Sequence, residues 1–193
     1  MRKSRTKIFY FLLTILFTSC YNSVLVDEFG TVWKKTNCNL WISQNGKLAL
    51  QSFDVSDMKN KKNVFIDHFS NGKPLNGLID TITFRYLGNY FYKDKNHVYN
   101  HNSMADGGHF LIVEEADSKT FIILGNFYGK DKTSIYSTRN RKLDLVDYAT
   151  FKTSSETDYY AKDKNGYCNM GEKIDTINAD DELKKIIQKL EKL

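Results

Sequence analysis

Three histidines in the stretch "HVYNHNSMADGGH" are the first residues of this chain that suggest chemistry: His97, His101 and His109. Three histidines can hold a zinc ion. On an extended strand, however, His97 and His101 lie about 13 Å apart along one face, whereas each nitrogen must approach zinc to about 2 Å. The glycine pair and β-branched residue among them argue against the helix that would bring them together. We therefore expect solvated or hydrogen-bonded histidines, and no metal.

Three aspartates, each at the centre of a Lys-Asp-Lys triplet, suggest calcium binding: Asp94, Asp131 and Asp163. A calcium loop needs several oxygen ligands at fixed offsets, and none of these loops offers a second nearby carboxylate. Aspartate in such a polar stretch favours a turn instead.

Other catalytic signals are weak. Cys168 is a conceivable nucleophile, but nothing beside it in the sequence lowers the pKa of its thiol. The chain contains no Gly-x-Ser-x-Gly, no His-Glu-x-x-His and no phosphate-binding glycine loop. Catalytic residues can still assemble from distant positions, so enzymatic activity stays open while a non-enzymatic role is favoured. We assign no catalytic residue and no cofactor.

The Lys-Asp-Lys triplets belong to a longer pattern that occurs three times. "YFYKDKNHVY" at 90–99 returns as "FYGKDKTSIY" at 127–136 and as "YYAKDKNGYC" at 159–168. Asp-x-x-Thr-Phe precedes each copy, at 80–84, 117–121 and 147–151, and its aspartate lies 14, 14 and 16 positions before the aspartate of the triplet. Repetition on this scale is typical of a modular array. The repeat motif residues are Asp80, Thr83, Phe84, Lys93, Asp94, Lys95, Tyr99, Asp117, Thr120, Phe121, Lys130, Asp131, Lys132, Tyr136, Asp147, Thr150, Phe151, Lys162, Asp163 and Lys164.

Each half of the motif predicts a local structure. An aspartate three residues before threonine can cap a single helical turn, after which the phenylalanine points inward. The Lys-Asp-Lys half predicts a β-hairpin. A three-residue loop with a left-handed last residue would place Lys93 opposite Tyr99, and Lys162 opposite Cys168. The rings at positions 91, 128 and 160 are expected in the core between stacked repeats, or else in a platform for a sugar or a protein partner.

These strings resemble the DKNYY repeat family of bacterial exported proteins and lipoproteins. The resemblance covers residues 80–172, although the second copy reads Lys-Asp-Lys-Thr and the third ends in cysteine. The family has no established biochemical role, so the resemblance implies no catalytic residues.

The N-terminus predicts export. Four basic residues precede an apolar run over 8–17, which is about half the length that spans a bilayer. "LFTSC" at 16–20 resembles a bacterial lipobox, which implies lipidation of Cys20; an ordinary secretory signal is the alternative. The expected location is the bacterial cell envelope, with the chain lipid-anchored and facing the periplasm or the outer membrane.

Removal of residues 1–19 changes the charge and the cysteine count. It takes four of the 28 basic residues and none of the 23 acidic ones, which leaves a net charge of +1. Such a balance gives no support for a nucleic-acid partner. Once Cys20 carries lipid, Cys38 and Cys168 remain as a candidate disulfide, and two separate thiols are the alternative.

The expected fold is mainly β: an array of three repeated β-hairpin units with an N-terminal β region and a C-terminal amphipathic capping helix. Asn45-Gly46 predicts a hairpin in the N-terminal region. Asn178 is the expected cap of a helix with Leu183, Ile186, Ile187 and Leu190 on one face. The expected divisions are a signal peptide at 1–19, the β region at 20–79, repeats at 80–104, 117–141 and 147–172, and the helix at 173–193.

These observations favour a non-enzymatic binding or interaction module that acts through stacked aromatic hairpins. Its expected partners are the membrane, through the lipid anchor, and a protein or glycan ligand. An immunity-type inhibitor of a periplasmic toxin and a hydrolase with an unrecognised site are the alternatives. The term "first", "second" or "third repeat" below refers to the three ranges just given.

Overall fold

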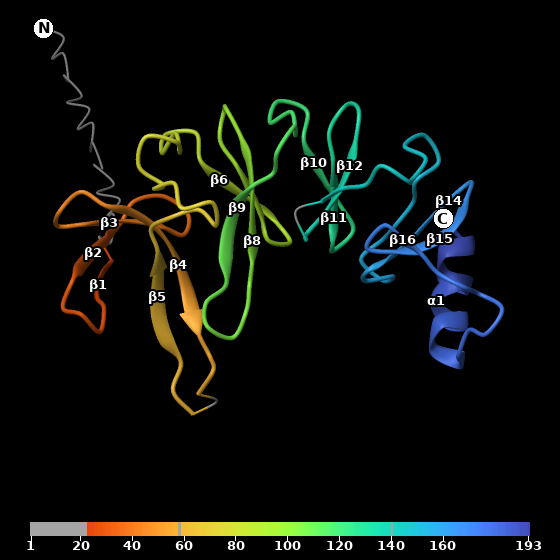
Figure 1. The fold of residues 1–193 in the computed structure, drawn as a ribbon, viewed down its shortest axis with the longest axis horizontal. Coiled ribbons are helices and arrows are strands. Elements are labelled where there is room, and N and C mark those ends of the chain that lie inside the picture. Colours follow the sequence, from red (N-terminus) through yellow and green to blue (C-terminus); the bar gives the residue numbers. More distant parts are fainter. Residues whose placement is uncertain (1–22, 58, 140) are drawn as a thin grey trace, which may run out of the picture.

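A computed structural model describes residues 23–193 except 58 and 140. The predicted cleavage region and Cys20 lie outside these residues. Four antiparallel sheets follow one another along the long axis of the molecule, and a single helix lies at the far end (Figure 1). The mainly β prediction is confirmed. Within the described residues, no helix has the length and apolar character needed to cross a bilayer.

The N-terminal sheet is a meander of five strands in sequence order. Its members are β1 (Val24–Val26), β2 (Val32–Lys35), β3 (Leu40–Ser43), β4 (Leu48–Asp54) and β5 (Lys62–Ile66). The predicted Asn45-Gly46 hairpin connects β3 to β4. Gly46 adopts φ +77°, a left-handed conformation that glycine tolerates without steric cost.

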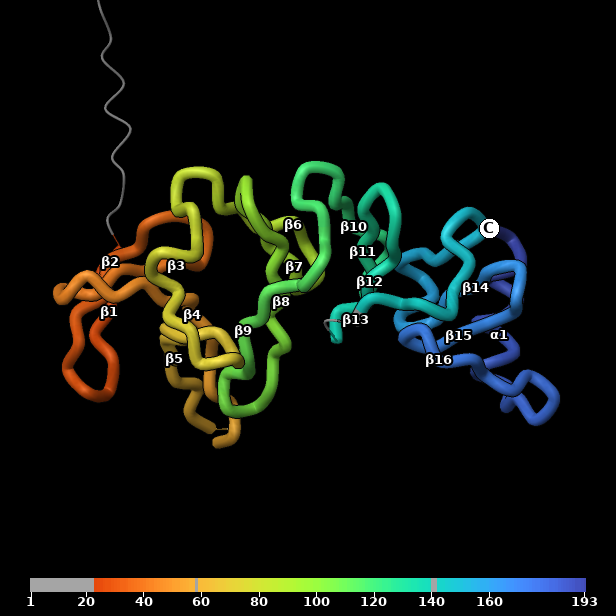
Figure 2. The backbone as a smooth tube through the Cα atoms, turned by 45° about the horizontal axis from the view of Figure 1, so that its top comes forward, coloured from red at the N-terminus to blue at the C-terminus, as the bar shows by residue number. Residues whose placement is uncertain are grey.

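Each repeat forms its own small meander, visible as successive turns of the tube in Figure 2. The first comprises β6 (Arg85–Gly88), β7 (Phe91–Lys93), β8 (Val98–Asn102) and β9 (His109–Ile112). The second comprises β10 (Ile122–Leu124), β11 (Tyr128–Lys130), β12 (Ile135–Ser137) and β13 (Arg141–Lys142). The third comprises β14 (Tyr160–Asp163), β15 (Gly166–Asn169) and β16 (Glu172–Lys173). Among the residues that the structure describes, the third meander lacks a counterpart of β6 and β10, the first strands of the other two. An isolated β-bridge between Lys152 and Lys162 lies at the equivalent position.

The hairpins have a different register from the predicted one. Lys93 lies opposite Val98, and Tyr99 lies opposite Tyr92. The second and third hairpins are shifted in the same way, with Lys130 opposite Ile135 and Lys162 opposite Tyr167. The cause is the length of the loop. In the first two repeats, the N–H of the triplet aspartate donates to the carbonyl of the residue three positions later. These two residues close the hairpin, and only two residues lie between them, one fewer than predicted.

Three hydrophobic cores of the described residues lie at the junctions between sheets, and a fourth lies on the N-terminal sheet. Leu40, Leu48 and Leu50 of the N-terminal sheet pack with Tyr92 and Tyr99 of the first repeat. A second core joins the first and second repeats, and a third joins the second and third. A small sheet is not stable unless its apolar face packs against another element, so each sheet depends on its neighbours in the row for stability.

Equivalent hydrogen bonds cross the two junctions between repeats. The side-chain amide of Asn89 donates to the Gly125 carbonyl at 2.5 Å, and that of Asn126 donates to the Ser155 carbonyl at 2.9 Å. In the opposite direction, the Ser118 hydroxyl donates to the Lys95 carbonyl, and the Tyr148 hydroxyl to the Asp131 carbonyl. The donor side chains occupy the same motif positions at both junctions.

The C-terminal helix α1 (Asp181–Glu191) covers the last sheet. Asp180 caps it by accepting the Leu183 N–H at 2.8 Å, so the cap is two residues later than the predicted Asn178. Leu190 is fully buried, and the carboxylate of Glu191 accepts the hydroxyl of Tyr167. The predicted apolar face therefore points to the fold.

The candidate disulfide is absent from the structure. Cys38 and Cys168 are both free thiols. Cys38 packs against the core below the first repeat, whereas Cys168 lies in the core between the second and third repeats. A whole junction separates the two sulfur atoms, so they cannot approach to bonding distance without rearrangement.

Candidate functional site

The two halves of the repeat motif bind each other. In the first repeat, Oδ2 of Asp94 accepts the backbone N–H of Asp80 at 2.7 Å. Asp80 caps the helical turn through the N–H and hydroxyl of Thr83, and the Thr83 hydroxyl accepts the N–H of Lys95 at 3.0 Å. The Lys95 ammonium returns to the Asp80 carboxylate at 2.6 Å. This closed set of contacts is called the motif network below.

The motif network recurs in the other two repeats. Asp131 accepts the Asp117 N–H at 2.9 Å, and Asp163 accepts the Asp147 N–H at 2.6 Å, despite the two extra residues between the latter pair. The threonine and lysine contacts recur as Thr120 with Lys132 and Thr150 with Lys164.

Hydrogen bonding keeps the capping aspartates ionised. The ammonium of Lys95, together with the two donors of Thr83, lowers the pKa of Asp80 to about 2. The pKa of Asp117 is lowered chiefly by the N–H of Lys119, and that of Asp147 chiefly by Lys164. Each carboxylate thus stabilises a turn as an anion.

The triplet aspartates therefore already have hydrogen-bond partners within the fold. Asp94 and Asp131 are each 3% exposed, and their oxygens accept backbone and tyrosine donors. Among the described residues, no group of three or more acidic, histidine or cysteine side chains is placed to hold a metal ion. The first aspartate of each motif accepts a backbone N–H of the turn that follows it, as predicted for a cap.

The three histidines do not converge. His101 contacts the Ser52 hydroxyl at 3.2 Å and the Gly107 carbonyl at 2.9 Å, and burial lowers the pKa of its imidazole. His97 occupies the hairpin turn beside Tyr99, and His109 begins β9.

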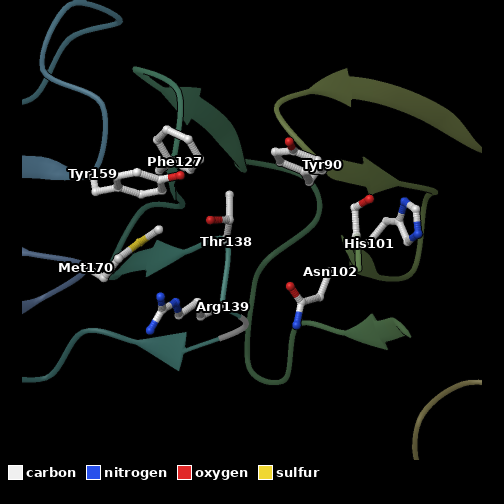
Figure 3. A pocket seen from close by; sticks show the side chains of 9 residues that line it. Tyr90, His101, Asn102, Phe127, Thr138, Arg139, Tyr159 and Met170 are labelled. Atoms are coloured by element: carbon white, nitrogen blue, oxygen red, sulfur yellow. The ribbon is translucent and has the colours of Figure 1, made fainter. Parts of the chain in front are cut away.

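A groove of about 200 Å³ runs across all three repeats (Figure 3). One aromatic residue comes from the same motif position of each repeat: Tyr90, Phe127 and Tyr159. Phe127 and Tyr159 lie against each other, with ring centroids 3.9 Å apart. Tyr90 and Tyr159 are 43% and 44% exposed, so both present their rings to solvent. We call this feature the aromatic groove.

A second row of equivalent residues completes the aromatic groove. His101, Thr138 and Met170 each follow the triplet aspartate by seven positions. Their backbone N–H groups donate to the carbonyls of Tyr90, Phe127 and Tyr159 at 2.8, 2.9 and 3.1 Å respectively. The same strand pairing therefore builds each section of the groove.

The charge of the aromatic groove is positive. Arg139 is its charged lining residue, and the lining includes no carboxylate. The hollow continues toward the N-terminal sheet through a space of about 410 Å³ that shares Tyr90 and His101, adds Tyr86 and Phe53, and again holds a cation, Lys61.

Tyr90 has a backbone conformation unusual for a bulky residue, with φ +68°. A left-handed tyrosine costs about 1 kcal/mol or more, and such positions concentrate at binding sites. This conformation places the ring at the groove and not in the adjoining core.

The rings that the sequence pattern predicts for the interior or a platform, at positions 91, 128 and 160, are the chain neighbours of the groove rings. Phe91 and Tyr128 are fully buried between sheets, as expected for core positions, and Tyr160 is half-buried. The groove uses the residue immediately before each of them, which lies in the turn that leads into the strand. The available signal was the doubled aromatic pair at the start of each copy.

Comparison with known protein families gives a match to part of the chain. The DKNYY family matches residues 108–173, which include the second and third repeats. No curated protein and no solved structure matches the chain. The predicted resemblance to the DKNYY family is confirmed over these residues.

Proposed function

We propose that this DKNYY family protein is a non-enzymatic binding module that holds an extended partner in the aromatic groove. The observation that carries the proposal is the recurrence of groove residues at equivalent positions of successive repeats. A ligand that lies along the row meets a similar aromatic contact in each section, which suits a chain-like partner better than a compact one.

The side chains of the aromatic groove support binding over catalysis. Exposed tyrosines combine an apolar ring with a polar hydroxyl, and such residues are enriched in recognition surfaces. The only imidazole in the lining, that of His101, already contacts Ser52 and Gly107. Arg139 and Lys61 favour a partner with negative charge along its length.

The location belongs to the same proposal. The signal-like N-terminus and Cys20 support a lipid-anchored protein of the bacterial envelope, facing the periplasm or the outer membrane. A surface anchor would place the aromatic groove near envelope proteins and glycans, which are the two partner classes that its chemistry suits.

The test is affinity capture from native envelopes with the full chain. We expect the wild type to retain a partner that the double variant Tyr90→Ala/Tyr159→Ala loses by at least ten-fold. Phe29→Ala is the matched control, because Phe29 is an aromatic residue that is 86% exposed and lies outside the groove. Protease or glycosidase treatment of the captured material then distinguishes a protein from a glycan.

Equal retention by the double variant would refute the groove as the binding site. Hydrolysis of a captured glycan or peptide by the wild type would refute a purely non-enzymatic role.

A further inference from the structure

The third repeat lacks a side chain that the other two share. Tyr99 and Tyr136 follow the triplet aspartate by five positions, and Cys168 occupies that position in the third repeat. Both tyrosines are almost completely buried, with exposed fractions of 0% and 1%.

The two tyrosine hydroxyls make the same pair of contacts. The Tyr99 hydroxyl lies 2.7 Å from Oδ2 of Asp94 and 3.4 Å from the Leu78 carbonyl. The Tyr136 hydroxyl lies 3.0 Å from Oδ2 of Asp131 and 3.3 Å from the Glu115 carbonyl. In each case the phenol hydroxyl contacts two acceptors. One is the carboxylate of the triplet aspartate, and the other is the backbone carbonyl of the residue two positions before the capping aspartate.

The third repeat has residues at the positions of both acceptors, and a cavity lies beside them. The cavity measures about 130 Å³, and its lining includes Asp163, Leu145 and Cys168. Asp163 and Leu145 are the counterparts of the carboxylate and carbonyl residues that hold Tyr99 and Tyr136. Lys173, which pairs with Cys168 across β15 and β16 as Lys142 pairs with Tyr136, also lines it.

We infer that this cavity binds a 4-substituted phenol, such as the side chain of a tyrosine. The hydroxyl of the ligand donates to Oδ2 of Asp163, an oxygen that otherwise accepts the Asp147 N–H. The ring occupies the volume left when cysteine replaces tyrosine. An apolar cavity of about 150 Å³ holds a benzene molecule, so the space is of the right size for one ring.

The exposure of the cavity and the low reactivity of its cysteine agree with reversible binding. Leu145 at the rim is 85% exposed, so the cavity opens to solvent. Burial raises the pKa of the Cys168 thiol, which keeps it protonated and a poor nucleophile at neutral pH. The site is therefore one of recognition, and it is separate from the aromatic groove.

The test uses the full chain and p-cresol, with calorimetry as the readout. We expect p-cresol to bind about ten-fold more tightly than toluene, because a hydrogen bond to a charged acceptor is the difference between the two. N-acetyl-tyrosinamide distinguishes the source of the phenol: binding equal to that of p-cresol assigns the site to a tyrosine side chain, and weaker binding assigns it to a small free phenol.

The variant Cys168→Tyr fills the cavity with the chain's own ring, and p-cresol binding should disappear. A second measurement does not depend on that variant folding: saturating p-cresol should slow alkylation of Cys168, read by peptide mass spectrometry, whereas toluene at the same concentration should not. Equal binding of toluene and p-cresol, unchanged alkylation, or p-cresol binding that persists in folded Cys168→Tyr would each overturn the inference.

Discussion

At the scale of single residues, the repeat motif is explained by hydrogen bonding. Asp80 has one carboxylate oxygen on Thr83 and the other on the Lys95 ammonium. Thr83 donates its hydroxyl to Asp80 and accepts from Lys95 with the same atom. Asparagine in place of the aspartate would remove the charge, and arginine in place of the lysine would change the geometry of the ammonium contact.

The low pKa of Asp80 predicts how stability depends on acid. Its folded value is about 2 and the ordinary value is 3.8, so the unfolded chain binds the proton first as the pH falls. The stabilisation is fully present above the ordinary value and is lost as the pH decreases from 3.8 toward 2. We expect Asp80→Asn to show a smaller fall in melting temperature over this window than the wild type does, measured by circular dichroism.

Asp144→Asn serves as the control for this titration, because Asp144 is exposed and takes no part in the motif network. An acid profile of Asp80→Asn identical to that of the wild type would show that the Asp80 contacts do not stabilise the fold.

At the scale of elements, each hairpin is tied to the turn that follows it in the chain. The ammonium of Lys93 is buried and donates to the carbonyls of Ser118 and Phe121, at 2.6 and 3.3 Å. It therefore satisfies the end of the helical turn of the second repeat. Lys130 makes a weaker equivalent contact, with its ammonium 5.8 Å from the centre of the Tyr148 ring.

This difference predicts unequal effects of the same substitution. Lys93→Met leaves two buried carbonyls without their donor and should lower the free energy of unfolding by roughly 1–3 kcal/mol. Lys130→Met removes a partly exposed cation–π contact and should cost about 0.5–1 kcal/mol. Urea denaturation of both variants measures the difference, and an equal loss would contradict the proposed link between repeats.

The elements were predictable where the signal is local. Asn45-Gly46 and the Asp-x-x-Thr turn depend on a few neighbouring residues, and both predictions are confirmed. The register of the hairpins was not predictable in the same way, because Lys93 opposite Val98 and Lys93 opposite Tyr99 differ by a single loop residue.

Long-range features were beyond the sequence. The candidate pairing of Cys38 with Cys168 depended on a distance that only the order of the cores fixes. The aromatic groove required knowing that the turn before β7 leaves Tyr90 exposed while Phe91 is buried, and that three sheets align. Motif spacing shows equivalence between copies, but it does not show which face of each copy remains open.

At the scale of the whole molecule, the fold is a row in which each sheet stabilises only its neighbours. In such arrays, stability is the sum of local units and nearest-neighbour interfaces. The helix α1 is the last member of the row, and it holds the third repeat through Leu190 and through the Glu191 carboxylate, which lies 3.8 Å from the Lys162 ammonium.

Loss of the helix contact should therefore have a local effect. Leu190→Ala is expected to lower stability by about 2–4 kcal/mol. Hydrogen exchange should accelerate over 152–169 and remain unchanged over 40–66, since three sheet junctions separate the third repeat, on which the helix packs, from the N-terminal sheet. Lys185→Ala, on the exposed side of α1, is the control. Uniform acceleration along the chain would indicate a single cooperative unit instead.

The matching hydrogen bonds at both junctions have an evolutionary consequence. Asn89 and Asn126 reach forward to the next sheet in the same manner, and Ser118 and Tyr148 reach back. A duplication that inserted another copy between two existing ones would meet complementary surfaces on both sides. Descendants of such an event would acquire a longer aromatic groove, one aromatic step at a time, without any change in the ancestral units.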